Sequence, residues 1–499
     1  MTALVYWWVW GAVSPLPAIH DEGAYLLQAR IFASGRWTAP ARPLPEFFDQ
    51  FYVLVTPALA SRFPPGHSLL LSLGQAVGFP VMVPLLLSGI TGGLLFILTT
   101  RLSGPLAGAL AWILWLMAPI NLAFRPIYLS NVTTGATWML GWWALLRWNE
   151  SRAMRWMLVL GACVGWCVIT RPLTGLVFAI SLAWPVLAVA RGTQGRRQAA
   201  AGVLVALAVS ALLPLANQRT TGSSMQMPWS LYSRQYMPYD RLGFGLDSTP
   251  PTRPINRETA AFNRIAMEYR RAHVPRALPR IAADRLARIA VGMWGAALLV
   301  WLPVAVLGIL KAPRQSRLAL WAAVLLVVAH LGYAHAPQWT VYYMEALPVL
   351  AFFTAVGLAW LLATAQGAGT GRRLSRVAAA AILVLWFVSS ARAVVAARGR
   401  SLRLHRPFTT FAQKLSTIRS EKAIVFVREG LSPSPNRSLI LNAPDLGRAP
   451  IWVVHDLGPR NKDLLRLAGC RSAYIYDPTS HVLNRWPPSS AGMVREPGP

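Results

Sequence analysis

Long uncharged apolar runs recur along this 499-residue chain, for example Phe79–Thr100, Val291–Leu310 and Ala346–Ala365. Each run is long enough to cross the hydrocarbon core of a bilayer, which takes about 20 residues. The chain is 55% hydrophobic and only 13% charged, which is too little polar surface for a soluble protein of this size. Because helices satisfy their own backbone hydrogen bonds in lipid, these runs predict an all-α polytopic membrane protein.

Window length and loop charge together predict about eleven transmembrane helices. We place them near 1–18, 80–100, 104–120, 131–147, 156–171, 174–190, 199–216, 290–310, 318–335, 341–363 and 376–396. The first span is expected to be a membrane helix and not a cleavable signal peptide, since Thr2–Val13 lacks a basic leader.

Basic residues are concentrated in every second connection between these spans. With the N-terminus inside, the five short cytoplasmic loops contain Arg101, then Arg147, Arg152 and Arg155, then Arg191, Arg196 and Arg197, then Lys311, Arg314 and Arg317, then Arg372, Arg373 and Arg376. This is the positive-inside pattern. It predicts that 19–79, 121–130, 217–289, 336–340 and the tail are external. The net charge of +30 is thus assigned to topology and anionic headgroups, and not to nucleic-acid binding.

The tail differs in composition from the rest, so we divide the chain into a transmembrane domain, 1–396, and an extracytoplasmic domain, 397–499. Short apolar runs separated by turn residues predict strands at Ala423–Val427, Ser438–Leu441, Ile451–Val454 and Ala473–Tyr476. About 100 residues are enough for a small α/β domain.

Two of the predicted external loops contain helical patterns of their own. In 19–79, the prolines at the start of Pro64–Leu71 favour a short helix. In 217–289, Glu258–Arg271 reads as an interfacial helix, with Ala261, Phe262, Ile265 and Tyr269 roughly on one face.

Acidic residues are scarce before Asp240, and four of the five that occur there lie in 19–79. These four are Asp21, Glu22, Glu46 and Asp49. A carboxylate at the membrane surface is costly unless it is solvated, paired or used. Asp21 and Glu22 are adjacent and therefore point in different directions, so one could act as a base while the other orients a helix or binds a metal. The alternative is that both residues cap the N-terminus of the following helix, where the helix dipole stabilises acidic side chains.

Several stretches resemble one family of membrane enzymes. His20–Arg30 and Ala33–Pro40 are similar to the first external loop of the protein O-mannosyltransferase and aminoarabinose transferase superfamily, which consists of GT-C class glycosyltransferases. Arg62–His67 resembles the Tyr-Pro-Pro-Gly motif that closes that loop. Thr170–Pro172 and Tyr342–Pro348 resemble recurring stretches, so that the resemblance covers about residues 1–365.

The resemblance implies an inverting transfer from a polyprenyl-phosphate-linked sugar donor at the external face of a bacterial inner (plasma) membrane. Asp21 takes the position of the base, with Glu22 in support. The acceptor is a glycan, a lipid or a protein, and membrane lipids are further partners. Arg62, which stands where some relatives have a lysine, is a candidate to bind the leaving phosphate, as are Arg171 and Arg234; the alternative for each is headgroup contact or snorkelling.

Three further residues complete the predicted binding site. Glu345 follows Tyr342 and Tyr343 at the external end of a span, where a lone acid suggests function, although a salt bridge to an arginine is the alternative. Tyr343 belongs to the same motif. His67, like His20, is a candidate proton-transfer or metal group, with a structural hydrogen bond as the alternative. A divalent metal ion is a candidate cofactor.

Two other functions compete with glycosyl transfer. A transporter or flippase of lipid-linked sugars would carry polar groups at mid-membrane, often in related halves, whereas the acids here cluster at the predicted surface. A catalytically inactive, glycan-binding relative would not need the Asp21–Glu22 pair.

Overall fold

Helices make up most of the computed structural model of this protein, which describes residues 1–11, 16–295, 298–364, 370–428 and 438–486. Every predicted span contains a helix. The helices in these spans are α1 (Thr2–Trp10), α4 (Met82–Ser103), α5 (Pro105–Leu116), α7 (Asn131–Ser151), α8 (Met154–Thr170), α9 (Pro172–Val189), α10 (Gly192–Ser210), α15 (Leu298–Lys311), α16 (Arg317–His330), α17 (Leu347–Thr364) and α18 (Thr370–Ser416). The prediction of a helical, multi-pass architecture therefore holds.

Helix lengths are less uniform than the predicted spans. In the described residues, four helical stretches are long and apolar enough to cross a membrane: Met82–Ser103, Gly192–Thr221, Thr340–Thr364 and Ala380–Ser416. A fifth results if Pro275–Trp294 and Leu299–Lys311, which meet at 96°, form one broken span. Prolines at the starts of α5, α9 and α6 (Pro119–Phe124) begin new helices and shorten their neighbours. The number of eleven spans stays a prediction.

The first predicted span is shorter than expected. Helix α1 ends at Trp10, residues 12–15 lie outside the described residues, and Leu16–Ile19 is not helical before α2 (His20–Ala33) begins. His20, Asp21 and Glu22 therefore form the first turn of a separate helix.

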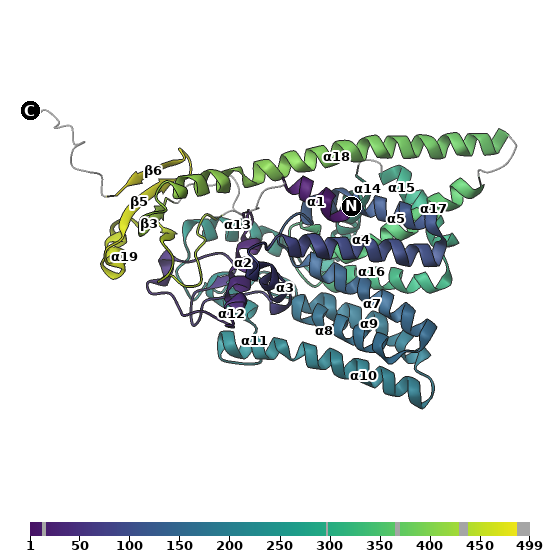
Figure 1. Ribbon diagram of the computed structural model, residues 1–499, viewed down its shortest axis with the longest axis horizontal. Helices are drawn as coiled ribbons and strands as arrows, with labels where there is room; N and C mark the ends of the chain where they lie inside the picture. Colours follow the sequence, from purple (N-terminus) through teal and green to yellow (C-terminus); the bar gives the residue numbers. More distant parts are fainter. Residues whose placement is uncertain (12–15, 296–297, 365–369, 429–437, 487–499) are drawn as a thin grey trace, which may run out of the picture.

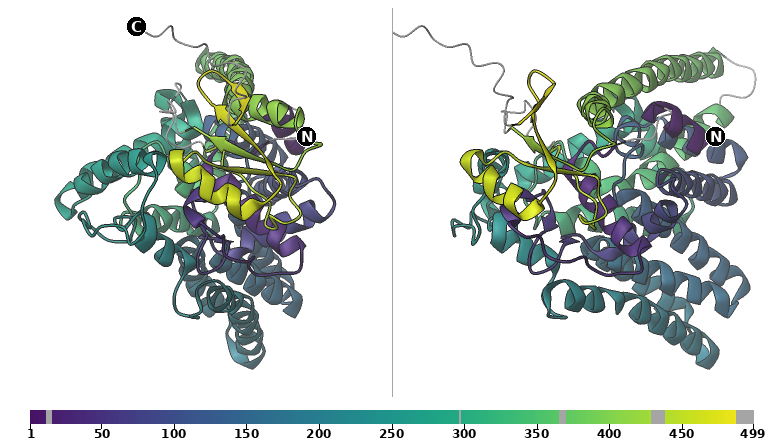
Figure 2. Two further views of the ribbon diagram at one scale, coloured as in Figure 1. Left: turned by 90° about the vertical axis from the view of Figure 1, so that its left-hand side faces the viewer. Right: turned by 60° about the vertical axis from the view of Figure 1, so that its left-hand side comes forward.

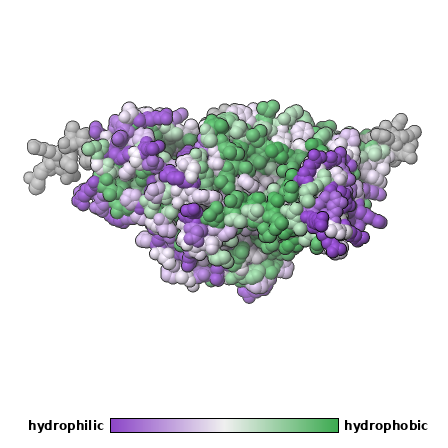
Figure 3. Space-filling view, turned by 60° about the horizontal axis from the view of Figure 1, so that its bottom comes forward, coloured by the Kyte–Doolittle hydropathy of each residue, from purple (hydrophilic) through white to green (hydrophobic). Residues whose placement is uncertain are grey.

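The segments predicted to be external gather at one end of the helix bundle, which we call the loop end (Figure 1). It contains α2, η1 (Pro45–Phe47), the β1–β2 pair (Val53–Leu54 and Ala60–Ser61), α3 (Pro65–Ala76), α11 (Leu212–Thr221), α12 (Pro228–Tyr236) and α13 (Arg257–Ala272). The ends of α4, α9 and α17 that carry the predicted cytoplasmic loops lie at the opposite end. Apolar side chains cover the middle of the surface, between polar ends (Figure 3).

Helix α3, predicted from Pro64–Leu71, starts at Pro65 and packs tightly on α8. A Cβ atom on Gly66 would lie 3.0 Å from the carbonyl oxygen of Ile169 and would also meet Oγ1 of Thr170. The glycine of the Pro-Pro-Gly string is thus required for close approach of the two helices. This contact places Arg62, just before α3, near the junction of α8 and α9.

The tail forms a four-stranded sheet with the order β4-β3-β5-β6, in which β6 alone is antiparallel. The strands are β3 (Ala423–Val427), β4 (Ile451–His455), β5 (Ser472–Asp477) and β6 (Val482–Arg485), with α19 (Asn461–Ala468) before β5. Three strand predictions are confirmed, but Ser438–Leu441 is not a strand; instead, Ile440 from that run packs in the core beneath the sheet. Helix α18 runs through the predicted domain boundary at 396/397.

The sheet shares its core with the first loop. Phe47 and Phe48 are buried together with Phe426 and Trp452 of the sheet. The side chain of Arg42 donates to the carbonyl of Ala443, and the His455 ring lies 2.7 Å from the carbonyl oxygen of Asp49. Viewed from the loop end, the sheet and α19 lie in front of this loop (Figure 2). The first loop is therefore held between the helix bundle and the sheet.

Helix α13 confirms the predicted helix in 217–289 but turns a different face inward. Phe262 is buried as expected, together with Asn263 and Arg270, whereas Ile265 is exposed. The reason is hydrogen bonding: Asn263 bonds to Tyr236 and Tyr239, and Arg270 to two backbone carbonyls. These polar contacts, and not hydrophobicity alone, set the rotation of the helix.

Candidate active site

A cavity of about 690 Å³ lies where the helix bundle meets the loop end. Its walls come from α2, the segment before α3, the α8–α9 junction, α13, the end of α16 and η5 (Thr340–Ala346). Its ionisable lining residues are Asp21, Tyr25, Tyr52, Arg62, Arg171, Tyr239, Asp240, Arg241, Tyr269, Arg270, His330, Tyr333, His335 and Tyr342, with His20 at the same rim. Aromatic Trp229, Phe262 and Trp339 complete a lining that suits a sugar ring and a charged group.

Asp21 projects from the first turn of α2 into this cavity. Burial raises the pKa of its carboxyl group to about 6, and the nearby positive charge of Arg62 limits that rise. In the described residues Asp21 takes part in no ion pair. A carboxylate that is not committed to a salt bridge and has a pKa near neutrality is suited to accept a proton.

Glu22, by contrast, points away from the cavity and is fully buried. One carboxylate oxygen accepts hydrogen bonds from the backbone N–H groups of Ala18 and Ile19, and the other accepts from the N–H of Tyr128, 2.9 Å away. Glu22 thus caps the N-terminus of α2 and ties it to the segment before α7. These contacts hold in place the first turn of α2, which also carries Asp21.

Arg62 is held by a residue that the sequence did not single out. A guanidinium nitrogen of Arg62 lies 2.7 Å from the carboxylate of Asp240, which also accepts a hydrogen bond from the hydroxyl of Tyr333. The guanidinium carbon lies 3.8 Å from the ring centre of Tyr52. Nε of Arg62 is buried and, within the described residues, has no hydrogen-bond partner. The side chain is therefore fixed, with a donor still available.

Arg171 lies at the α8–α9 junction and faces the same cavity. One of its nitrogens donates to the carbonyl of Val341 and lies 3.4 Å from the carboxylate of Glu345. Glu345 itself is buried below the cavity wall, where it accepts a hydrogen bond from Thr134. The predicted alternative for Glu345, a salt bridge to an arginine, is what the structure has.

Other predicted residues lie outside the cavity lining. His67 is buried, with its ring nitrogens 2.8 Å from Oγ1 of Thr133 and 3.2 Å from the carbonyl oxygen of Tyr128, and burial lowers its pKa to about 3. Tyr343 is buried behind the lining residue His335, with its hydroxyl 2.8 Å from that ring. Arg234 is exposed on α12. The geometry gives none of the three a direct contact with a ligand in this cavity.

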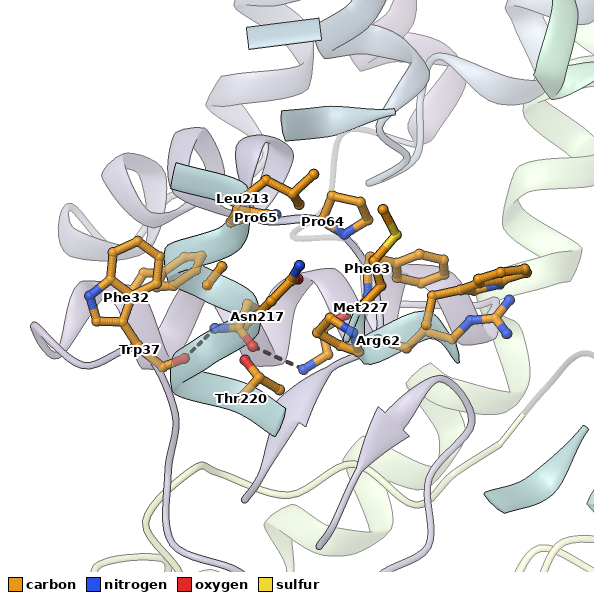
Figure 4. Close-up of a pocket in the computed structure, with 15 residues that line it drawn as sticks. Phe32, Trp37, Arg62, Phe63, Pro64, Pro65, Leu213, Asn217, Thr220 and Met227 are labelled. Carbon is orange, nitrogen blue, oxygen red and sulfur yellow. Dashed lines mark hydrogen bonds between the residues drawn. The ribbon is translucent and has the colours of Figure 1, made fainter. Parts of the chain in front are cut away.

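A smaller pocket of about 30 Å³ adjoins the cavity (Figure 4). Phe32 and Trp37 lie on one side of it, and Leu213, Asn217 and Thr220 come from α11. Arg62, Phe63 and Pro64 line both spaces, so this segment lies between them. The pocket is large enough to hold a water molecule and too small for a sugar ring.

The divalent metal ion suggested by the resemblance stays a prediction for the described residues. They contain no group of three or more His, Cys, Asp or Glu side chains placed to hold an ion. In the cavity lining, the carboxylate of Asp240 is already shared by Arg62 and Tyr333, which leaves Asp21 as the one other carboxylate.

Fold and cavity together define a class: a multi-pass membrane protein with a charged cavity at one end and a small α/β domain beside it. No family model and no curated protein sequence matches the chain. Among solved structures it is similar to ArnT from Cupriavidus metallidurans bound to undecaprenyl phosphate, with a TM-score of 0.55 and 16% identity over 95% of this chain and 92% of that one.

A second similar structure is the oligosaccharyltransferase of Archaeoglobus fulgidus in its apo form. The TM-score is 0.50 and the identity 15%, over 84% of this chain and 57% of that one. These two likenesses show that the chain shares the fold of the solved proteins.

Proposed function

We propose that this protein is a glycosyltransferase that moves a sugar from a polyprenyl-phosphate donor to an acceptor hydroxyl at the external face of the membrane, with inversion. The observation that carries the proposal is the placement of Asp21, Arg62 and Arg171 around one cavity at the loop end. The fold of a protein solved with undecaprenyl phosphate supports the donor class.

In the proposed reaction, Asp21 accepts the proton of the acceptor hydroxyl as its oxygen attacks the anomeric carbon. The bond between that carbon and the phosphate oxygen breaks, and the electron pair leaves with the polyprenyl phosphate. The base and the leaving group lie on opposite faces of the sugar, which inverts the anomeric centre.

The leaving phosphate requires positive charge in a place shielded from water. Arg62 and Arg171 supply it. Arg62 is held by Asp240 and by the Tyr52 ring, and Arg171 by Glu345 and the carbonyl of Val341. Because both side chains are anchored before substrate binds, little reorganisation is needed during the reaction.

The test is to replace Asp21 by Asn, which keeps the size of the side chain and removes the base. We expect release of undecaprenyl phosphate from undecaprenyl-phosphate-linked sugars, measured in membranes containing the protein, to slow by about 100-fold or more. Undiminished transfer by a folded Asp21→Asn variant would exclude this residue as the base.

Asp49→Asn is a matched control. Asp49 lies in the same loop and its pKa is likewise raised to about 6 by burial, but the residue does not line the cavity. Its hydrogen bond from the hydroxyl of Tyr236 can be kept by the amide oxygen of Asn. We expect this variant to retain transfer.

A further inference from the structure

Arg270 is a buried arginine in the cavity wall that the proposed reaction does not use. It belongs to the last turn of α13, and only 2% of its surface is exposed. Its Nε donates to the carbonyl of Gly245 at 2.7 Å, and one terminal nitrogen donates to the carbonyl of Arg241 at 2.9 Å. The other terminal nitrogen is buried and, in the described part of the chain, has no hydrogen-bond partner.

The other arginines of the cavity wall all have carboxylate partners. Arg62 pairs with Asp240, Arg171 with Glu345, and the half-exposed Arg241 with Asp247 at 3.5 Å. Within the described residues Arg270 takes part in no ion pair. A buried guanidinium without a counter-charge is unfavourable unless a ligand supplies the negative charge. The two backbone carbonyls fix the direction of the group without neutralising it.

The surrounding loop is strongly basic. Residues 217–289 contain twelve arginines and five acidic residues, even though this segment is predicted to be external. Long loops escape the positive-inside rule, so topology alone does not account for the excess. Six of these arginines are exposed on α13, α14 (Leu278–Trp294) and their connection: Arg257, Arg264, Arg271, Arg276, Arg280 and Arg288. Such a surface attracts anionic molecules to this part of the protein.

We propose that Arg270 forms an anion subsite for a phosphate or carboxylate group carried by the acceptor, separate from the donor phosphate at Arg62 and Arg171. This inference rests on the proposed function and extends it, because it makes the acceptor an anionic molecule. The donor phosphate is attached to the anomeric carbon and must therefore lie near Asp21. Arg270 instead donates to backbone carbonyls of the loop 241–245, whose Arg241 is half-exposed, and it shares no ion-pair partner with Arg62 or Arg171 among the described residues.

The binding test uses the purified full-length protein saturated with undecaprenyl phosphate, and then titrates inorganic phosphate. We expect one additional phosphate per protein. Arg270→Gln should lose at least about 10-fold in phosphate affinity, and its affinity for undecaprenyl phosphate should be unchanged, which also shows that the variant is folded. Arg264→Gln, an exposed arginine of the same helix, is the control and should bind both ligands normally. Saturable phosphate binding that is equal in Arg270→Gln and in the unmodified protein would overturn the proposal, as would no additional phosphate.

Competition then identifies the source of the anion. Displacement of inorganic phosphate by nanodiscs containing phosphatidic acid, but not by phosphatidylcholine nanodiscs, assigns the subsite to a lipid-borne phosphate. Displacement by glycerol 3-phosphate alone assigns it to a soluble acceptor. Displacement by neither marks inorganic phosphate as an adventitious ion only and overturns the proposal. Failure of undecaprenyl phosphate to bind would count against the proposed donor, while phosphate binding at Arg270 can still be measured without it.

Discussion

The carboxylate of Asp240 lies 2.7 Å from a guanidinium nitrogen of Arg62, and thereby joins the segment before α3 to the loop 217–289. Both side chains are largely buried, and Asp240 also accepts from Tyr333. This pair places the proposed phosphate-binding arginine beside the proposed base.

Breaking the Arg62–Asp240 pair on one side should destabilise the protein strongly. Arg62→Gln leaves the buried carboxylate of Asp240 without its counter-charge, which costs about 3–5 kcal/mol for such pairs. Adding Asp240→Asn should recover a part of that loss, so that the double variant is more stable than the sum of the two single effects predicts. Thermal unfolding of the four proteins in detergent measures the coupling, and strictly additive effects would contradict it.

The transfer rate should depend on the protonation of Asp21. Since its pKa is raised to about 6 and the base must be ionised, the rate should fall about tenfold per pH unit below pH 6 and level off above it. Arg62 lowers this pKa and Asp240 raises it. Arg62→Gln should therefore shift the acidic limb to higher pH, and Asp240→Asn to lower pH. Initial rates between pH 4.5 and about 8 test both directions; shifts of the same sign would contradict the assignment.

Arg171 and Glu345 should be coupled in stability but not in activity. Arg171→Gln removes the ion-pair partner of a carboxylate that is only 1% exposed, and should lower the melting temperature. Adding Glu345→Gln to the Arg171→Gln variant removes the buried, unpaired carboxylate. This second change should recover most of the lost melting temperature. Transfer should stay low in both, because the proposed phosphate ligand is still missing. Recovery of full activity by the second change would show that Arg171 acts only through Glu345.

Phe47 should hold the first loop against the sheet. Phe47→Ala opens a void in the core shared with Phe426 and should cost about 3–5 kcal/mol. Hydrogen exchange should then rise in residues 42–55 and in β3, with little change in α7 and α8. Phe47→Leu, which fills most of the space, should show a much smaller increase. Unchanged exchange in the first loop would mean that other contacts hold it.

Much of the fold follows from hydropathy. Uncharged runs located the helices, and alternating arginines indicated which connections share an end of the bundle. The scarcity of acidic residues singles out Asp21 and Glu22, and the resemblance of one short string assigns Asp21 the role of base. These are local signals, so a single sequence carries them.

The rest of the site depends on distant pairs that a sequence does not show. No local sequence feature distinguishes Asp240 from the other acidic residues of its loop, and only the fold places it beside Arg62. The same loop contains twelve arginines; Arg234, a predicted phosphate ligand, is exposed, whereas Arg270 faces the cavity. Which one turns inward depends on the rotation of α13, and polar contacts of Asn263 and Arg270 set that rotation. Counting polar as well as apolar residues on the buried face would have favoured Arg270.

The shared core of the first loop and the C-terminal sheet also orders events during biosynthesis. The loop that carries Asp21 is synthesised before its packing partners in β3 and β4, which must reach the same side of the membrane. A newly made chain therefore has its proposed base before it has the support that positions the loop. Catalytic competence should arise late, when the sheet docks, so that an incomplete chain in the membrane does not consume donor lipid.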